Sequence, residues 1–175
     1  MPAPTSYAGP RRDEGKRKPT YSQTTKSNLS HNVAKVADLL AKKGNDIYSV
    51  QPDDIMGMAV DIMREKRIGA LIVTSPGGTL EGILSERDIV RKLSETPGQV
   101  LKQKVEALMT RKVQVVSPDE PLMTVLQRMT DGRFRHMPVM DGNKLIGMVT
   151  IGDVVNFRLK ELEHETMQLK QIIVG

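Results

Sequence analysis

The residues best suited to bind a ligand are two hydroxyl–carboxylate pairs. Ser85 precedes Asp88 by three residues and Thr150 precedes Asp153 by the same spacing, each after an apolar stretch and before a predicted helix. A helix start presents free backbone N–H groups and positive potential, which favour phosphate. A carboxylate can accept two hydrogen bonds at once, which suits the neighbouring hydroxyls of a ribose. This pattern therefore favours a nucleotide site at each helix start.

The same spacing also has a purely structural explanation. A Ser or Thr at the N-cap and an acidic residue three positions later form a capping box, which closes the first turn of a helix. One such pair alone indicates a helix start more often than a ligand site. Two pairs at equivalent places of a repeat favour the ligand site.

Both pairs end one of two copies of a repeat, separated by about 65 residues. The copies differ by one residue in a predicted hairpin turn, which spans 75–78 in one copy and 141–143 in the other. A length change confined to a turn is typical of two versions of one fold. The matching segments of the first and second copies are 49–54 and 115–120, 70–73 and 136–139, and 82–88 and 147–153.

Each copy is predicted to fold as strand, helix, strand, strand and helix. Pro52 and Pro118, each followed by acidic residues, are expected to open the first helix. Ser117 and Glu120 should form a capping box. Because a hairpin cannot bury its own apolar face, the copies should pack together in an α+β fold. The predicted inward side chains are Ile55, Ala59, Ile62 and Met63 in the first copy, and Leu122, Val125, Leu126 and Met129 in the second.

The remaining organisation follows from composition and periodicity. Residues 1–28 are rich in Pro, Ser, Thr and Lys and are predicted to be a disordered basic leader. A helix capped by Ser30 is expected next. The predicted boundaries are the N-terminal helix at 29–44, the first copy at 45–100, the second copy at 101–160 and the end of the last helix at 161–175.

Charge and composition exclude several classes of function. Residues 1–44 hold nine Lys and Arg against three Asp and Glu, whereas residues 45–175 hold 17 against 18, so the basic excess belongs to the leader. The absence of cysteine excludes disulfides, Cys-based zinc sites and a thiol nucleophile. With no long apolar run and no signal peptide, we expect a cytoplasmic protein without membrane contact. No phosphate-binding Gly-rich motif or metal-like His spacing occurs, so we expect no enzyme and no metal site.

The doubled Gly-h-h-Ser/Thr-x-x-Asp pattern, with a Pro-Val strand before the second, resembles a tandem of CBS domains, or Bateman module, of the stand-alone type. The resemblance covers residues 40–160. It implies a regulatory module with two clefts between the repeats, which bind AMP, ATP or another adenosyl or nicotinamide nucleotide such as NAD(H). It also implies that each cleft borrows a segment from the other repeat.

The resemblance implies roles for individual residues. Asp88 and Asp153 would hold ribose hydroxyls, with Ser85 and Thr150 beside the phosphate or sugar. The borrowed segments are Ile47 with 68–70 for the Asp153 cleft, and Thr110, Val113 and Phe134 for the Asp88 cleft. The expected ligand-binding residues are Ile47, Gly69, Ala70, Ser85, Arg87, Asp88, Thr110, Val113, Phe134, Arg135, His136, Thr150, Gly152 and Asp153.

The two copies differ in charge near the expected phosphate. Arg135 and His136 stand where the first copy has Gly69 and Ala70, and related modules place basic residues at these positions. The Asp153 cleft is therefore assigned the richer basic complement. In the Asp88 cleft, Arg87 is expected to hold the phosphate, whereas Arg91 is expected to belong to a solvated helix face.

From Val154 one long helix is predicted, with an apolar seam at alternating spacings of four and three. The seam either packs on its own module or joins two copies as a homodimer, which we prefer. The preferred function is a nucleotide sensor that regulates a separate partner protein. The alternative is a dimeric scaffold whose leader binds an acidic partner or nucleic acid. An enzyme that uses a bound dinucleotide is the least supported. The seam residues are Val155, Leu159, Leu162, Thr166, Leu169 and Ile173.

Overall fold

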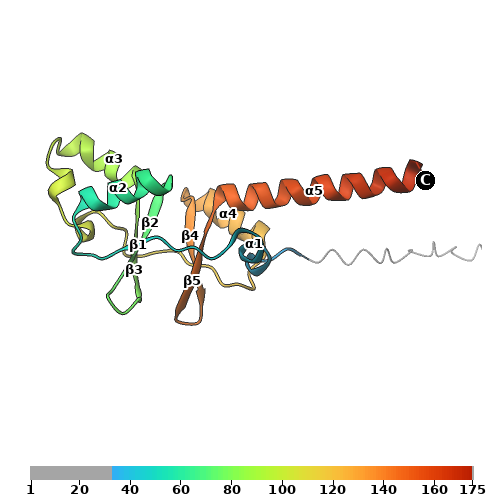
Figure 1. Ribbon diagram of the computed structural model, residues 1–175, viewed down its shortest axis with the longest axis horizontal. Helices are drawn as coiled ribbons and strands as arrows, with labels where there is room; N and C mark the ends of the chain where they lie inside the picture. Colours follow the sequence, from blue (N-terminus) through green and yellow to red (C-terminus); the bar gives the residue numbers. More distant parts are fainter. Residues whose placement is uncertain (1–32, 175) are drawn as a thin grey trace, which may run out of the picture. The chain divides into compact units, whose positions relative to one another are not determined.

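The computed structural model describes residues 33–174, so the predicted leader and Ser30 lie outside the described residues. The described part has the predicted α+β fold (Figure 1). None of its helices is long and apolar enough to cross a membrane. In chain order the elements are α1 (Val36–Lys43), β1 (Ser49–Val50), α2 (Met56–Lys66), β2 (Ala70–Thr74), β3 (Leu80–Ser85), α3 (Glu86–Glu95), the 3-10 turns η1 (Val100–Lys102) and η2 (Val105–Ala107), α4 (Leu122–Gly132), β4 (His136–Asp141), β5 (Lys144–Thr150) and α5 (Ile151–Val174).

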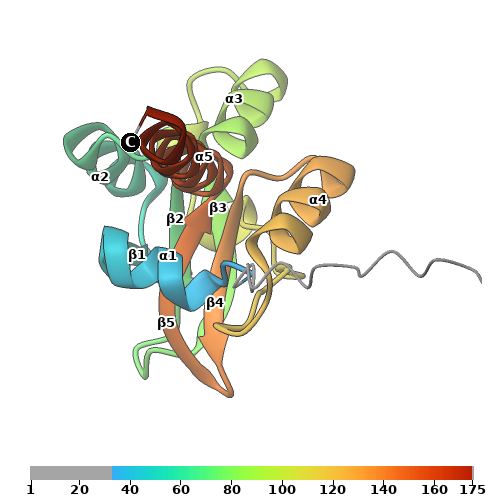
Figure 2. The same ribbon diagram turned by 90° about the vertical axis from the view of Figure 1, so that its right-hand side faces the viewer.

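The two copies build two small sheets whose hairpins lie side by side (Figures 1 and 2). In the first copy, β1 pairs with β2 in parallel and β2 pairs with β3 antiparallel. In the second, β4 and β5 form the hairpin, and the equivalent of β1 is reduced to one parallel bridge between Val116 and Val139. Both hairpins shift register at the same place, after Val73 and after Val139. The repeat read from the sequence is therefore a repeat of structure.

The proline segments form turns and do not open the helices, contrary to the prediction. In the first copy, the N–H of Asp54 donates to the carbonyl of Gln51 at 3.2 Å. The N–H of Gln51 in turn donates to the Asp54 carboxylate at 2.7 Å. The aspartate thus closes its own turn. Helix α2 starts only after Ile55, its N-cap, whose side chain is 47% exposed and not buried as predicted.

The second copy makes the same turn, in which the N–H of Glu120 donates to the carbonyl of Ser117 at 3.2 Å. The Glu120 carboxylate accepts a hydrogen bond from Arg128 at 2.6 Å. A charge-assisted bond of this kind is stronger than a bond to a backbone amide. The predicted capping box is therefore wrong, and α4 follows Pro121.

The helix predicted at 29–44 is shorter at its start. Lys35 forms an antiparallel bridge with Pro121, and the N–H of Val36 donates to the carbonyl of Glu120 at 3.0 Å. Pairing with the second copy thus holds the chain extended up to Lys35. The N–H of Lys35 donates to the Asp38 carboxylate at 2.8 Å, which caps α1 at this point.

The hydrophobic cores do not follow the order of the chain. Helix α1 precedes the first copy, yet Val36, Leu39 and Leu40 belong to the core of the second copy. The segment after α3 contributes three residues to the core of the first copy, and two of them lie beyond residue 100, the predicted end of that copy. These three residues are Val100, Val105 and Met109.

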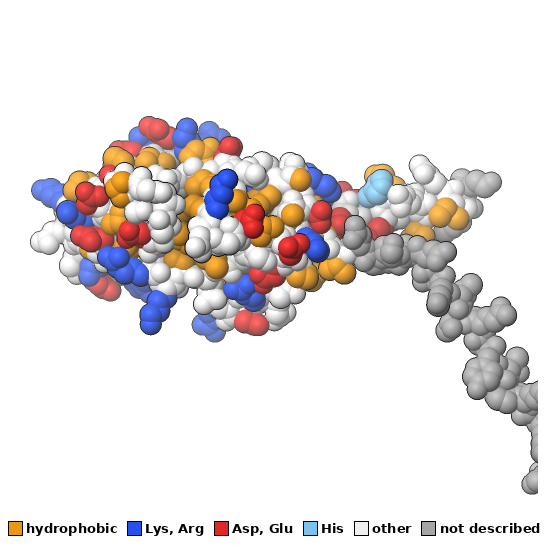
Figure 3. Space-filling model, turned by 90° about the horizontal axis from the view of Figure 1, so that it is seen from below, with side chains coloured by type: hydrophobic (Ala, Val, Ile, Leu, Met, Phe, Trp, Pro, Cys, Tyr) orange, Lys and Arg blue, Asp and Glu red, His pale blue; other side chains and the backbone are white. Residues whose placement is uncertain are grey.

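Helix α5 begins at Ile151, directly after the predicted cap Thr150 and three residues before the long helix predicted from Val154, and only its first part is buried. Val154 and Phe157 enter the core, whereas no side chain from Arg158 to Ile172 is buried. Figure 3 shows hydrophobic side chains on this extension and mixed charges over the rest of that face. The exposed large apolar residues of α5 are Val155, Leu159, Leu162, Met167, Leu169 and Ile172.

Candidate ligand-binding site

Both hydroxyl–carboxylate pairs form capping boxes. The N–H of Ser85 donates to the Asp88 carboxylate at 3.1 Å, and the N–H of Asp88 donates weakly to the Ser85 hydroxyl at 3.4 Å. The N–H of Thr150 donates to Asp153 at 2.9 Å, and the N–H of Asp153 donates to Thr150 at 3.1 Å. Each cap uses one carboxylate oxygen, Oδ2, and leaves Oδ1 for another partner. Capping and ligand binding are therefore compatible at both sites.

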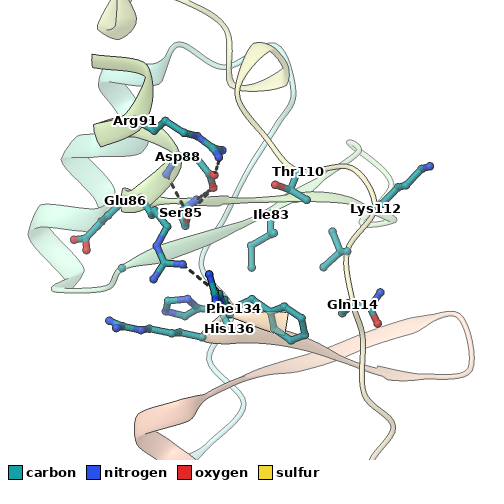
Figure 4. A pocket seen from close by; sticks show the side chains of 15 residues that line it. Ile83, Ser85, Glu86, Asp88, Arg91, Thr110, Lys112, Gln114, Phe134 and His136 are labelled. Carbon is teal, nitrogen blue, oxygen red and sulfur yellow. Dashed lines mark hydrogen bonds and ion pairs between the residues drawn. The ribbon is translucent and has the colours of Figure 1, made fainter. Parts of the chain in front are cut away.

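A cavity of about 360 Å³ lies against the first pair, between the two copies (Figure 4). Asp88 faces it from the start of α3, and Phe134 and His136 face it from the second copy. Thr110 is held beside β3 by two backbone hydrogen bonds with Ile83, of 2.8 and 3.0 Å. The structure thus brings Thr110, Val113 and Phe134 together with Asp88, as the predicted borrowing requires.

This cavity is rich in positive charge, so the prediction that the Asp88 cleft has the thinner basic complement is wrong. The start of α3 and the turn before β4 converge here, and Arg87 Nη1 donates to the carbonyl of Arg133 at 2.8 Å. The only acidic lining residues among those described are Glu86 and Asp88. The lining cations are Arg87, Arg91, Lys112, Arg133 and Arg135.

Arg91 differs from its predicted place on a purely solvated face. Its side chain is 71% exposed, but Nη2 lies 3.0 Å from Oδ1 of Asp88 and the residue lines the cavity. The Asp88 side chain itself is only 14% exposed. An exposed ion pair within one helix contributes little stability. Arg91 can therefore leave Asp88 at low cost.

A second cavity of about 350 Å³ lies against the other pair. Gly69 and Ala70 of the first copy face Thr150 and Gly152 of the second across it. Its described lining includes neither Ile47 nor Asp153, so two predicted members are set apart from it. Its cationic lining is Arg67 and Arg135, together with the imidazole of His136.

The Asp153 carboxylate is already engaged. Lys43, the last residue of α1, places Nζ 2.7 Å from Oδ2 of Asp153. Burial alone would raise the pKa of Asp153, but the hydrogen bonds from Lys43 and Thr150 outweigh it and hold the pKa below its usual value. Asp153 is therefore fully charged near neutral pH.

His136 lines both cavities and is predominantly neutral at pH 7. Burial lowers its pKa from the ordinary value, and the nearby charges of Arg135 and Lys43 act in the same direction. Glu86 and Asp153 oppose this effect without reversing it. The imidazole therefore offers one donor and one acceptor, whereas Arg135 carries the fixed positive charge.

Sequence reasoning missed several residues of the site. Arg67 and Arg133 end α2 and α4 in left-handed conformation, with φ of 53° and 55°. Glycine is the usual residue at such a helix end. The arginine that stands there in both copies could therefore have marked these two residues in the sequence. Lys43 gave no such signal, because its contact depends on α1 docking against the second copy. The described residues 33–174 contain no metal-binding cluster of three or more acidic or histidine side chains.

The structure is a paired-repeat module built from two copies of one β-α-β-β unit. Each cavity lies where the start of the last helix of one copy meets the turn before the hairpin of the other copy. The CBS-domain family model matches residues 32–95 and 105–160. The chain belongs to the CBS-domain family.

Individual relatives agree with this assignment. The mitochondrial CBS domain-containing protein CBSX3 of Arabidopsis thaliana is 35% identical over 159 residues, which are 89% of this chain and 74% of that protein. A CBS-domain protein from Agrobacterium tumefaciens is 37% identical, with a TM-score of 0.70 over 72% of this chain and 94% of that chain. The CBS domain pair of protein MJ0100 was solved with 5-methylthioadenosine and S-adenosyl-L-methionine. It is 25% identical, with a TM-score of 0.65 over 74% of this chain and 98% of that chain.

Proposed function

We propose that this protein is a regulatory sensor that binds an adenosine-type nucleotide, AMP, ATP or NAD(H), in the clefts between its CBS repeats. The observation that carries the proposal is the Asp88 cavity, in which a carboxylate, a helix start, apolar side chains and cations surround one space. Its volume of about 360 Å³ falls within the range of small-molecule sites.

Each part of the cavity matches one part of a nucleotide. Asp88 accepts hydrogen bonds from the ribose hydroxyls once Arg91 turns away. Ile83, Val113 and Phe134 supply the apolar surface for the base. The arginines bind the phosphates, because a guanidinium makes paired charge-assisted bonds to phosphate oxygens.

Charge selects among adenosine-type ligands. The MJ0100 pair was solved with two adenosyl compounds that carry no phosphate. The cavity of this chain has five cationic side chains against two acidic ones, which favours an anionic ligand. We therefore expect nucleotides with phosphate groups to bind more tightly than 5-methylthioadenosine, a thioether, or S-adenosyl-L-methionine, a sulfonium.

The role that these contacts support is binding and not catalysis. The Asp88 carboxylate caps a helix and pairs with Arg91, and Arg87 is bonded to a backbone carbonyl. Groups held in this way fix a ligand and link the two repeats. We infer that occupancy is read by a separate partner protein, in a compartment that holds adenine nucleotides. The predicted cytoplasm is one such compartment, and the mitochondrion named for the Arabidopsis relative is another.

The proposed assembly is a homodimer formed through α5. Its exposed apolar residues include Leu159, Leu162 and Leu169, which follow the spacing of a coiled-coil seam. A helix with such a seam is stabilised when the seam is covered by a second helix.

A ligand panel tests the proposed function. Thermal unfolding and titration calorimetry are run with AMP, ATP, NAD⁺, NADH, S-adenosyl-L-methionine and 5-methylthioadenosine. A ligand present at 100 times its Kd should stabilise the fold by about 2.7 kcal/mol and raise Tm. The phosphate-bearing ligands should give the larger shifts. No shift and no heat with any member of the panel would contradict the proposal.

A further inference from the structure

Asp88 and Asp153, the two carboxylates proposed to bind ribose, have different ion-pair partners. Asp88 pairs with Arg91 of its own helix, whose side chain is 71% exposed. Asp153 pairs with Lys43, which comes from α1, and the two side chains are only 30% and 28% exposed. The first partner can rotate into solvent without any change in packing, whereas the second bridges two elements.

Lys43 is the last residue of α1, and the end of this helix makes several contacts. The N–H of Gly44 donates to the carbonyl of Leu40 at 2.9 Å and closes the last turn. Leu40 fills the space above Gly147, where an added Cβ would lie 3.0 Å from a Leu40 methyl carbon. The adjacent Lys42 places its ammonium 4.3 Å from the centre of the Phe157 ring. The hydrogen bond of Gly44 and the packing of Leu40 hold the backbone of Lys43 beside Asp153.

Lys43 contacts Oδ2 of Asp153, the oxygen that also caps α5, so a ribose hydroxyl that approaches Oδ1 meets a carboxylate whose negative charge this ammonium already balances. A hydrogen bond between two charged groups is stronger than one between a hydroxyl and a carboxylate, and partial burial reduces screening by water. The lowered pKa of Asp153 agrees with a tight pair. The competition at Asp88 is weaker, because its partner is exposed.

We propose that Lys43 determines which cleft is filled: its ammonium balances the charge of Asp153, so that a nucleotide binds first beside Asp88 and binds tightly beside Asp153 only when Lys43 releases the carboxylate. This inference rests on the proposed function, because it assumes that the clefts bind nucleotide. It makes α1 part of the second site. Any partner that displaces α1 would raise the affinity of that site.

The test is titration calorimetry of the full chain with AMP and with ATP. The wild type should bind one nucleotide per chain tightly and a second at least about ten-fold more weakly. Lys43→Met keeps the apolar stem and removes the charge. It should strengthen the second site about ten-fold, so that the two sites become similar. Lys43→Gln should act in the same direction, and unfolding curves confirm that both variants are folded.

Two further variants identify the sites. Lys42→Met removes the neighbouring ammonium, which lies over Phe157, and should leave both affinities as in the wild type. Asp88→Ala should weaken the tight site of the wild type by about ten- to a hundred-fold and leave the strengthened second site of Lys43→Met intact. A double variant that loses both sites would assign the strengthened site to the Asp88 cleft and overturn the inference.

The outcomes separate this inference from the proposed function. Two sites of equal affinity in the wild type, unchanged by Lys43→Met, would overturn the inference and leave the sensor intact. A second site that weakens in Lys43→Met would show that Lys43 is a ligand contact, which also overturns it. No binding of AMP or ATP by the wild type or by Lys43→Met would overturn the inference, and extending the result to the whole ligand panel would overturn the proposed function as well.

Discussion

At the scale of single residues, Asp88 caps a helix and is proposed to bind ribose. Two measurements on one variant separate these roles. Asp88→Ala removes a capping contact, which should cost about 1 kcal/mol of unfolding free energy. It also removes the proposed ribose acceptor, and losing hydrogen bonds to a charged group should lower nucleotide affinity by about ten- to a hundred-fold. Denaturant unfolding measures the first effect and calorimetry the second.

Asp153→Ala is the matched control, because Asp153 makes the same cap at the start of α5. It should lower stability by at least as much as Asp88→Ala, since the Lys43 side chain that it leaves unpaired is less exposed than Arg91, the partner of Asp88. The affinity of the tight site should be nearly unchanged. Unaltered affinity in a well-folded Asp88→Ala variant would show that Asp88 is a helix cap alone.

His136 makes stability depend on pH. Burial lowers its pKa in the folded state, so the unfolded chain binds more protons as pH falls through about 6.5. The contribution of neutral His136 is present above that pH and is progressively lost below it, down to the lowered pKa of the folded state. Wild type should therefore lose more unfolding free energy between pH 8 and pH 5.5 than His136→Gln. Equal losses in denaturant titrations would contradict this prediction.

At the scale of elements, Arg67 and Arg133 each end a helix in left-handed backbone conformation and also line a cavity. An L-residue in this conformation is strained, and glycine relieves the strain while raising the entropy of the unfolded chain. Arg133→Gly should therefore be neutral or stabilise the fold by up to about 1 kcal/mol, yet weaken nucleotide binding in the Asp88 cavity. Arg67→Gly is the matched control, since Arg67 lines only the second cavity. A loss of stability without any loss of affinity in Arg133→Gly would refute the proposed binding role.

The sequence predicted those elements whose signals are local. Both hairpins follow from apolar runs around Gly-rich turns, and the starts of α3 and α5 follow from Ser85 and Thr150 with their paired acids. The starts of α1, α2 and α4 were misplaced, because side chains or distant backbone take the groups that a local cap would use. Lys35 pairs with Pro121, for example, and the Glu120 carboxylate binds Arg128.

The residues of the site also fall into those that the sequence indicates and those that only the packing of the chain reveals. Ser85 and Asp88 of the repeated motif line one cavity together with the borrowed Thr110, Val113 and Phe134, which the family resemblance supplied. Asp153 of the same motif is set apart from the second cavity. The charge balance could not be predicted, because it depends on side chains converging from both copies. The Lys43 contact with Asp153 joins residues 110 positions apart and follows only from the packing of α1.

At the scale of the whole molecule, the exposed seam of α5 predicts association. Leu162→Glu would place a charge at the centre of the proposed interface, where burying it without a partner is unfavourable. The variant should sediment as a monomer at a micromolar concentration at which the wild type is a dimer. Gln168→Glu adds the same charge elsewhere on the exposed helix and should leave the dimer intact. A monomeric wild type would refute this assembly.

The packing of α1 also has a consequence for the order in which the chain can fold. Val36 and Leu39 precede the first repeat, but their core partners Met137, Val149 and Val154 follow it in the chain and are synthesised later. A nascent chain can complete the core of the first repeat early, whereas α1 must wait for the second repeat. Removal of residues 1–44 should therefore loosen the distant second repeat more than the adjacent first one. Amide exchange should then accelerate in β4 and β5 while β2 and β3 keep their protection.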